Sequence, residues 1–191
     1  MLGRPPENST LPQDTRILLQ LGLHSLVPQS IHKDVSQINV GKDFWQPPPH
    51  GFLKINIDGA SKGNPGVAGF SGVIRDEQGC IKDIFHCHLG TATNSMAKLM
   101  ALEQCLEILI ESNSHNAIIK ANSELVINAA KQICNGKAPG KVSKHWRLLQ
   151  VFQRIHSHLQ TLRTTNFVHV QRKANMLADR LANGVFCKKK L

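Results

Sequence analysis

The sequence contains no tyrosine, and aromatic residues make up only 5% of it. A chain this poor in aromatic rings is not expected to hold nucleic acid mainly by base stacking.

Five cysteines without a C-x-x-C pair predict no zinc site. Their odd number argues against a disulfide framework, and free thiols suit a reducing compartment. No apolar run approaches the ~20 residues of a membrane helix. The 191 residues, 41% of them hydrophobic, suit one globular domain with an extension.

Acidic residues almost disappear from the last third of the chain. Residues 126–191 hold thirteen basic side chains and one acidic side chain, Asp179. Residues 1–50 are balanced at four of each sign, and residues 51–125 hold six basic and eight acidic side chains. The whole excess behind the net charge of +10 therefore lies near the C-terminus. Such a charge field favours a polyanion, so nucleic acid is the first expected partner and a solubilising surface is the alternative.

Proline spacing divides the chain into three parts. Residues 1–50 are rich in proline and are expected to form an arm that ends in the stiff triplet Pro47–Pro49. Residues 51–187 are expected to form the domain, and residues 188–191 a basic tail.

The beginning of the chain gives little information on the compartment. It has no secretory apolar segment, so we expect an intracellular protein. Glu7 and Asp14 count against an organelle transit peptide, which would be rich in arginine and poor in acids. Organelle (mitochondrion or chloroplast) and nucleus or cytoplasm all remain open.

From residue 52 onward, hydrophobic periodicity and turn residues predict an alternation of strands and helices. The expected strands are Leu53–Asp58, Val67–Arg75, Cys80–Leu89, Ala117–Ala121 and Thr164–Val170. The expected helices are Met96–Glu111 (capped by Asn94 or Ser95), Ser123–Cys134, Val142–Leu162 (with Trp146, Leu149, Phe152, Ile155 and Leu159 on one face) and Ala174–Phe186. This order predicts an α/β domain whose mixed five-stranded sheet has three antiparallel and then two parallel strands, flanked by helices.

Several motifs occur in an order that resembles type 1 ribonuclease H. The segments 57–61 (IDGAS), 63–66 (GNPG) and 68–73 (AGFSGV) are similar to the opening of that domain, and 169–175 (HVQRKAN) with 178–183 (ADRLAN) are similar to its ending. The resemblance covers about residues 44–187. It is nearest to the ribonuclease H-like module of plant non-LTR retroelements, where a Trp-x-Pro-Pro-Pro linker similar to Trp45–Pro49 precedes the domain.

The resemblance implies cleavage of the RNA strand of an RNA/DNA hybrid by two Mg²⁺ ions held on carboxylates in the order Asp, Glu, Asp, Asp. Asp58 stands at the first of these positions and Asp179 at the fourth. Lys98 stands at the glutamate position, in the segment AKLMAL, and Asn122 stands at the third position, in the segment KANS. Two of the four carboxylates are therefore replaced.

The replacements change the charge of the predicted site. Two dications ~4 Å apart require hard anionic ligands, and the four residues now supply a formal charge of −1 instead of −4. A lysine ammonium about 4 Å from a dication costs on the order of 8 kcal/mol at an effective dielectric constant near 20. We therefore expect no productive two-metal site and no cofactor. Asp58 and Asp179 hold at most one weakly bound Mg²⁺, which any residual activity would use, or Lys98 forms an ion pair with Asp58.

Neighbouring residues offer little replacement chemistry. The acids closest in sequence are expected to be solvated helix charges: Glu103, Glu107, Glu111 and Glu124. His169 matches the family's catalytic histidine by its distance from the last helix, but it also fits the strand pattern of residues 167–170, where a structural role is expected.

Basic and loop residues make up the predicted nucleic-acid surface. Gly63 and Asn64 let a loop backbone approach a sugar–phosphate edge, with an ordinary turn as the alternative. The resemblance to domains with a basic protrusion adds a helix–loop–helix cluster, and the chain end extends it. The candidate residues are Lys131, Lys137, Lys141, Lys144, Arg147, Arg154, Arg172, Lys173 and Asn175.

The sequence thus predicts a catalytically degenerate ribonuclease H-like protein that binds RNA or an RNA-containing duplex. It allows a structural part in a larger ribonucleoprotein such as an organellar ribosome. One alternative is an active, metal-dependent hybrid nuclease with a rearranged site. Another is an interaction adaptor anchored by the arm of residues 1–50.

Overall fold

A computed structural model describes residues 46–114, 116–143, 146–162 and 164–184. Most of the predicted arm, Lys144 and the basic tail lie outside these ranges. Among the described helices, none is both long and apolar enough to cross a membrane.

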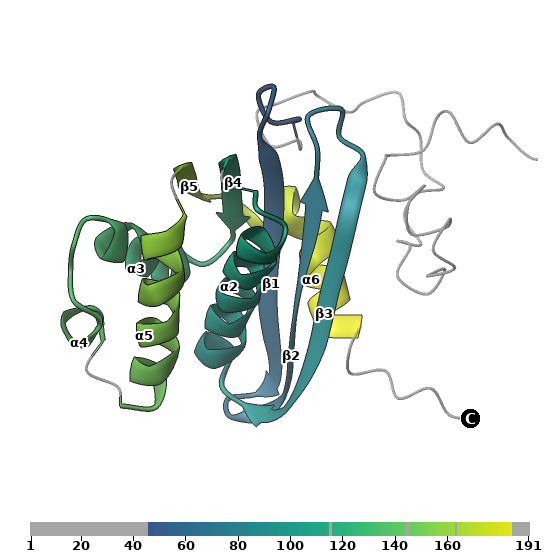
Figure 1. Ribbon diagram of the computed structural model, residues 1–191. Helices are drawn as coiled ribbons and strands as arrows, with labels where there is room; N and C mark the ends of the chain where they lie inside the picture. The colour runs from purple at the N-terminus through teal and green to yellow at the C-terminus, as the bar shows by residue number, and fades with distance from the viewer. Residues whose placement is uncertain (1–45, 115, 144–145, 163, 185–191) are drawn as a thin grey trace, which may run out of the picture. The chain divides into compact units, whose positions relative to one another are not determined.

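The five strands form one mixed sheet in the order β3-β2-β1-β4-β5 (Figure 1). Its strands are β1 (Leu53–Gly63), β2 (Gly66–Arg75), β3 (Ile81–Ala92), β4 (Asn116–Ala121) and β5 (Thr164–His169). The first three pair antiparallel, β4 pairs parallel with β1, and β5 pairs parallel with β4. The predicted fold class is therefore confirmed, because short turns join the first three strands and helical crossovers reach the last two.

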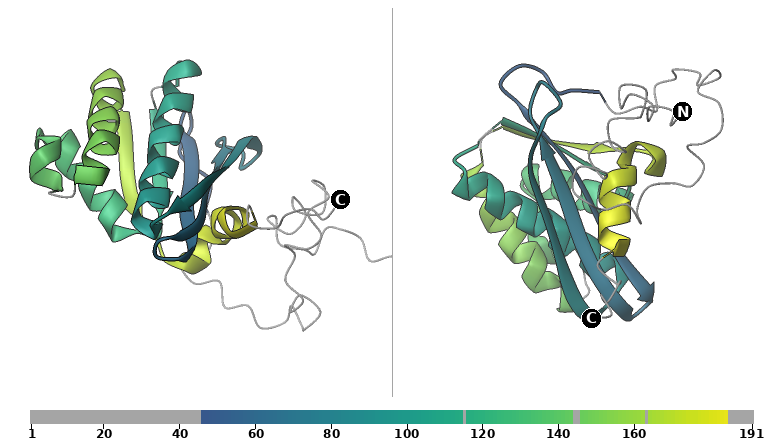
Figure 2. Two further views of the ribbon diagram at one scale, coloured as in Figure 1. Left: turned by 90° about the horizontal axis from the view of Figure 1, so that it is seen from below. Right: turned by 90° about the vertical axis from the view of Figure 1, so that its right-hand side faces the viewer.

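Helices cover the two faces of the sheet unequally, as the two views of Figure 2 show. α2, α3 and α5 lie on one face, and α6 lies on the other. The helical segments are α2 (Asn94–Glu111), α3 (Glu124–Cys134), α4 (Pro139–Val142), α5 (Trp146–Thr161), the 3-10 turn η5 (Arg172–Asn175) and α6 (Met176–Gly184).

The core lies between the sheet and α2, α3 and α5. Alternate residues of the central strands point into it, and one side of α2 closes it. Its fully buried members include Ile55, Ile57, Ile119, Leu99, Leu102, Leu106 and Ile155. Each such side chain contributes about 1.5–3 kcal/mol relative to exposure, so the sheet and α2 form a rigid base for the residues at their ends.

The helix expected over residues 142–162 begins later, at Trp146, and residue 142 belongs to a separate short helix. Pro139 starts the short helix α4, and Ser143 then adopts an extended conformation before α5 begins at Trp146. Trp146, expected on the buried face, is 73% exposed, and the buried residues of α5 begin only at Val151. Phe152, Ile155 and Leu159 are buried, as the periodicity predicted.

α2 begins two residues earlier than expected, and its N-cap is Thr93 instead of Asn94 or Ser95. The Thr93 hydroxyl accepts a hydrogen bond from the Met96 amide at 3.2 Å. The Asn94 amide instead donates to the Asn64 side chain at 3.1 Å. The first turn of α2 is therefore fixed to the loop between β1 and β2.

β1 and α2 touch through their backbones at Gly59. A Cβ atom there would lie 2.3 Å from the Ala97 carbonyl carbon and 2.4 Å from the Lys98 amide nitrogen. Only glycine fits this approach, and the contact brings Lys98 beside the residue that precedes Gly59, Asp58.

We predict that Gly59→Ala destabilises the domain by about 3 kcal/mol, because the added methyl group must displace the α2 backbone. Gly140→Ala is the matched control, since a Cβ atom there meets nothing within 4 Å. Urea unfolding followed by circular dichroism measures both variants. Equal unfolding midpoints would contradict the close approach of β1 and α2.

Candidate functional site

The two replaced positions and Asp58 form one hydrogen-bonded group. The Lys98 ammonium lies 2.7 Å from Oδ1 of Asp58 and 3.3 Å from Oδ1 of Asn122. The Asn122 amide nitrogen in turn donates to Oδ2 of Asp58 at 3.3 Å. Three elements bring these side chains together: β1, the first turns of α2, and the end of β4, where Ala121 pairs with Ile57. The ion pair between Lys98 and Asp58, one of the two alternatives that the sequence left open, is present.

Burial governs the charge state of this group. Asp58 is 3% exposed, and its burial raises the pKa of the carboxyl above the ordinary value. The Lys98 ammonium and the Gly59 amide, which donates to Oδ1 at 2.8 Å, oppose that rise. The negative charge of Asp179 acts in the same direction as burial. A cation beside Asp58 therefore offsets a substantial desolvation cost.

The second remnant carboxylate has its own cation. Nε and Nη2 of Arg172 both donate to Oδ1 of Asp179, at 3.0 and 2.6 Å. This contact raises the pKa of the Arg172 guanidinium, and the charge of Asp58 adds to the rise. The two ion pairs are thus electrostatic neighbours. The pairing of Arg172 with Asp179 was not predicted from the sequence. Arg172 lies in η5, and Asp179 lies seven positions further along the chain, in the first turn of α6.

A buried amide pair positions η5 and α6 against the sheet. Asn175 donates to the Ile57 carbonyl at 2.9 Å, and Asn56 donates to the side-chain oxygen of Asn175 at 2.9 Å. Ser71 of β2 donates to the Ala178 carbonyl at 2.7 Å. Asn175 was a candidate for nucleic-acid contact, yet it is 1% exposed. It instead holds the segment that carries Arg172.

These residues do not fit a pair of Mg²⁺ ions. Asp58, Asp179, Lys98 and Arg172 have a formal charge of zero, where the family pattern provides four carboxylates. An ammonium or a guanidinium donates hydrogen bonds to each remnant carboxylate. The sequence also allowed a single weakly bound Mg²⁺ on Asp58 and Asp179. To bind both carboxylates, that ion would have to displace the Lys98 ammonium and the Arg172 guanidinium.

Other predicted positions lie around this centre. Gly63 has a φ of +100°, which favours glycine, and Asn64 fastens its loop to the start of α2. His169 is the last residue of β5, is exposed, and pairs in register with Ala121. The strand position expected for His169 is thus observed, and its catalytic assignment stays a prediction.

The predicted basic residues divide into two groups. The first is exposed and consists of Lys131, Lys137, Lys141, Arg147 and Lys173. The Arg147 guanidinium lies over the exposed Trp146 ring, 5.2 Å from its centre. The second group is committed to carboxylates: Arg172 pairs with Asp179, and Arg154 pairs with Glu103.

Glu103 was expected to be a solvated charge, and that expectation was wrong. It is 5% exposed, and Nη2 of Arg154 donates to its Oε2 at 3.1 Å. The missed signal was its place four residues after the buried Leu99, on the side of α2 that faces α5. Glu107 and His158 complete a group whose ligand atoms lie within 4.8 Å of one another. A divalent cation there would compete with the Arg154 guanidinium for Glu103.

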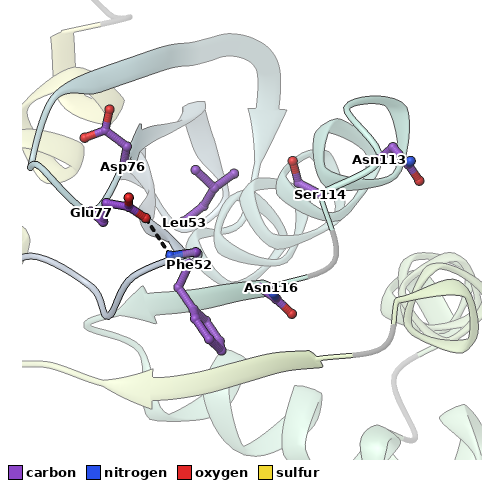
Figure 3. A pocket seen from close by; sticks show the side chains of 8 residues that line it. Phe52, Leu53, Asp76, Glu77, Asn113, Ser114 and Asn116 are labelled. Atoms are coloured by element: carbon purple, nitrogen blue, oxygen red, sulfur yellow. Dashed lines mark hydrogen bonds between the residues drawn. The ribbon is translucent and has the colours of Figure 1, made fainter.

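A hollow of about 470 Å³ opens at the start of β1, away from Asp58 (Figure 3). Its lining includes Phe52, Leu53, Asp76, Glu77 and Asn116. The Gly51 amide donates to Glu77, and this bond lowers the pKa of that carboxyl. Two acidic side chains make this hollow unsuitable for a polyanion, so the candidate site remains at Asp58.

The sheet order, the buried aspartate on the central strand and the aspartate in the first turn of α6 define an α/β domain of the ribonuclease H fold. The profile of the family described as "Reverse transcriptase-like" matches residues 56–185. The chain belongs to this family of ribonuclease H-like domains. The family resemblance predicted from the motifs is therefore confirmed.

Proteins similar in sequence include "Putative ribonuclease H protein At1g65750" of Arabidopsis thaliana, 32% identical over 142 residues. That match covers 74% of this chain and 22% of the relative. "Bifunctional protein Rv2228c" of Mycobacterium tuberculosis is 31% identical, with 68% of this chain and 34% of the relative covered. The match thus spans about a third of the length of one relative and less than a quarter of the other.

Similar solved structures include LC11-RNase H1 in complex with an RNA/DNA hybrid, with a TM-score of 0.58 and 31% identity. That match covers 69% of this chain and 94% of the other. RNase H1 of Halobacterium salinarum NRC-1 has a TM-score of 0.59 and 28% identity, with 69% and 95% covered.

We predict that Lys98→Met costs about 3 kcal/mol of stability at pH 7, because it leaves Asp58 buried without its cation. The folded-state pKa of Asp58 lies above the unfolded value and rises further in the variant. Protonation therefore favours the folded state, and the loss shrinks as pH falls through the folded pKa.

Urea unfolding between pH 4 and pH 8 measures this dependence. Lys82→Met, at an exposed position of β3, is the control and is expected to change little at any pH. A loss for Lys98→Met of the same size at every pH would contradict the role of the ion pair.

Proposed function

We propose that this domain binds RNA/DNA hybrids, or other RNA-containing duplexes, without cleaving them. The observation that carries the proposal is the Lys98 ammonium 2.7 Å from Asp58, at the position where the family pattern has a metal-binding glutamate. An ammonium neutralises a carboxylate but cannot activate a water molecule or polarise a phosphoryl oxygen as a coordinated metal does.

Binding is supported by the exposed basic residues and by the relatives. Residues 126–191 hold thirteen basic side chains against one acidic side chain. LC11-RNase H1, 31% identical, was solved with an RNA/DNA hybrid bound. The contact is expected to be made to the phosphate backbone and to the shape of the A-form-like duplex, because base stacking has few aromatic rings to use. A place in a larger ribonucleoprotein stays a prediction, and the sequence leaves organelle, nucleus and cytoplasm open as the compartment.

Binding and cleavage are tested separately on the same labelled hybrid. Fluorescence anisotropy is expected to show an association constant that falls steeply and linearly with salt concentration on logarithmic axes. Gel analysis in Mg²⁺ or Mn²⁺ is expected to show no cut strand. Undetectable binding at 50 mM salt would contradict the proposed binding of the hybrid. Cleavage by the wild-type chain that Asp58→Asn abolishes would contradict the proposed absence of catalysis.

Restoring the two replaced carboxylates tests whether their replacement accounts for the proposed absence of cleavage. We predict that Lys98→Glu combined with Asn122→Asp produces Mg²⁺-dependent cleavage of the hybrid, because it returns four carboxylates to the fold. The matched control adds Asp58→Asn to the same pair of substitutions and is expected to be inactive. An inactive double variant that binds the hybrid normally would show that these two replacements are not what silences the site.

A further inference from the structure

We propose that the two ion pairs form a metal-independent site for one backbone phosphate. In this site the Lys98 ammonium and the Arg172 guanidinium bridge the remnant carboxylates below them to a phosphodiester above them. The inference rests on the proposed function, because it names the atoms that would hold the duplex at this position.

In each ion pair the cation is the more exposed partner. The Arg172 side chain is 72% exposed, and that of Asp179 is 20% exposed. The Lys98 side chain is 18% exposed, and that of Asp58 is 3% exposed. A group that approaches from solvent therefore meets the nitrogen donors before it meets the carboxylate oxygens. An anion is favoured at this surface although the four charges cancel.

Both cations keep donor capacity for a second anion. An ammonium has three N–H donors, and Lys98 directs two of them at Asp58 and Asn122. A guanidinium has five, and Arg172 directs those of Nε and Nη2 at Asp179. A phosphate suits the remaining N–H donors, because its oxygens accept several charge-assisted hydrogen bonds and match the planar fork of an arginine.

The framework around the pairs is rigid enough to hold this geometry. Asn175 and Asn56 connect η5 to β1 through buried hydrogen bonds, so the segment that carries Arg172 is fixed against the strand that carries Asp58. Lys98 sits where the α2 backbone touches Gly59. Lys173, exposed beside Arg172, adds positive charge at the same edge. Preorganised donors of this kind lower the entropic cost of binding.

The test is the salt dependence of hybrid binding by the full chain. Complete loss of this phosphate contact is expected to make the plot of log K against log salt less steep by about 0.9, and to weaken binding roughly eightfold at 0.1 M salt. Arg172→Gln and Lys98→Met should each shift the slope in this direction, by up to this amount, because both cations hold the same phosphate. Lys82→Met is the matched control and should leave the slope unchanged. The exposed Arg172 keeps the test informative if Lys98→Met folds poorly.

Magnesium provides the second readout. For the wild-type chain, added Mg²⁺ is expected to weaken hybrid binding as a competing counterion, and EDTA should have no effect. For the variant with Lys98→Glu and Asn122→Asp, measured on a hybrid whose RNA strand is chemically non-cleavable, added Mg²⁺ should instead strengthen binding. A hybrid that binds with unchanged slopes in Arg172→Gln and Lys98→Met would overturn this site and leave the proposed function intact. Absence of any binding by the wild-type chain would overturn both.

Discussion

The ion pair between Lys98 and Asp58 is the interaction on which the rest of the site depends. An aspartate that is 3% exposed needs a cation within reach. A ribonuclease H active site meets that need with divalent metal ions, whereas here the cation is part of the chain. A tethered ammonium cannot be diluted or chelated, and unlike a divalent metal ion it has no coordination position at which a water molecule is activated. The lysine at this position therefore supplies, from within the chain, the positive charge that the buried carboxylate requires.

The scaffold around this ion pair fixes its geometry. Gly59 allows β1 and α2 to touch, and the Asn56–Asn175 amide pair fastens the last helical segment to the central strand. The exposed basic side chains occupy other elements, chiefly α3, α4 and α5. Most exposed basic side chains therefore lie on elements other than those that carry Asp58, Lys98 and Asn122. The proposed duplex binding depends mainly on these basic side chains, whereas cleavage would depend on metal ligands at Asp58.

Strand alternation and turn residues were sufficient to predict the sheet, because these signals are local. The replaced site positions were also visible, since they lie in short motifs of fixed spacing. Contacts between distant segments were not predictable. The burial of Glu103 depends on Arg154, 51 residues further along the chain, and the exposure of Trp146 depends on where α5 meets α2. The pairing of Arg172 with Asp179 requires the turn η5, whose boundary the hydrophobic pattern does not mark.

The most direct measurement is an anomalous difference map from crystals of the wild-type chain soaked in Mn²⁺. It locates each ion and distinguishes the Asp58 site from the group at Glu103. We expect no manganese peak within coordination distance of Asp58, with the Lys98 side chain ordered against its carboxylate. Two peaks about 4 Å apart beside Asp58, with Lys98 turned away, would contradict the replacement of the metal ions by the lysine.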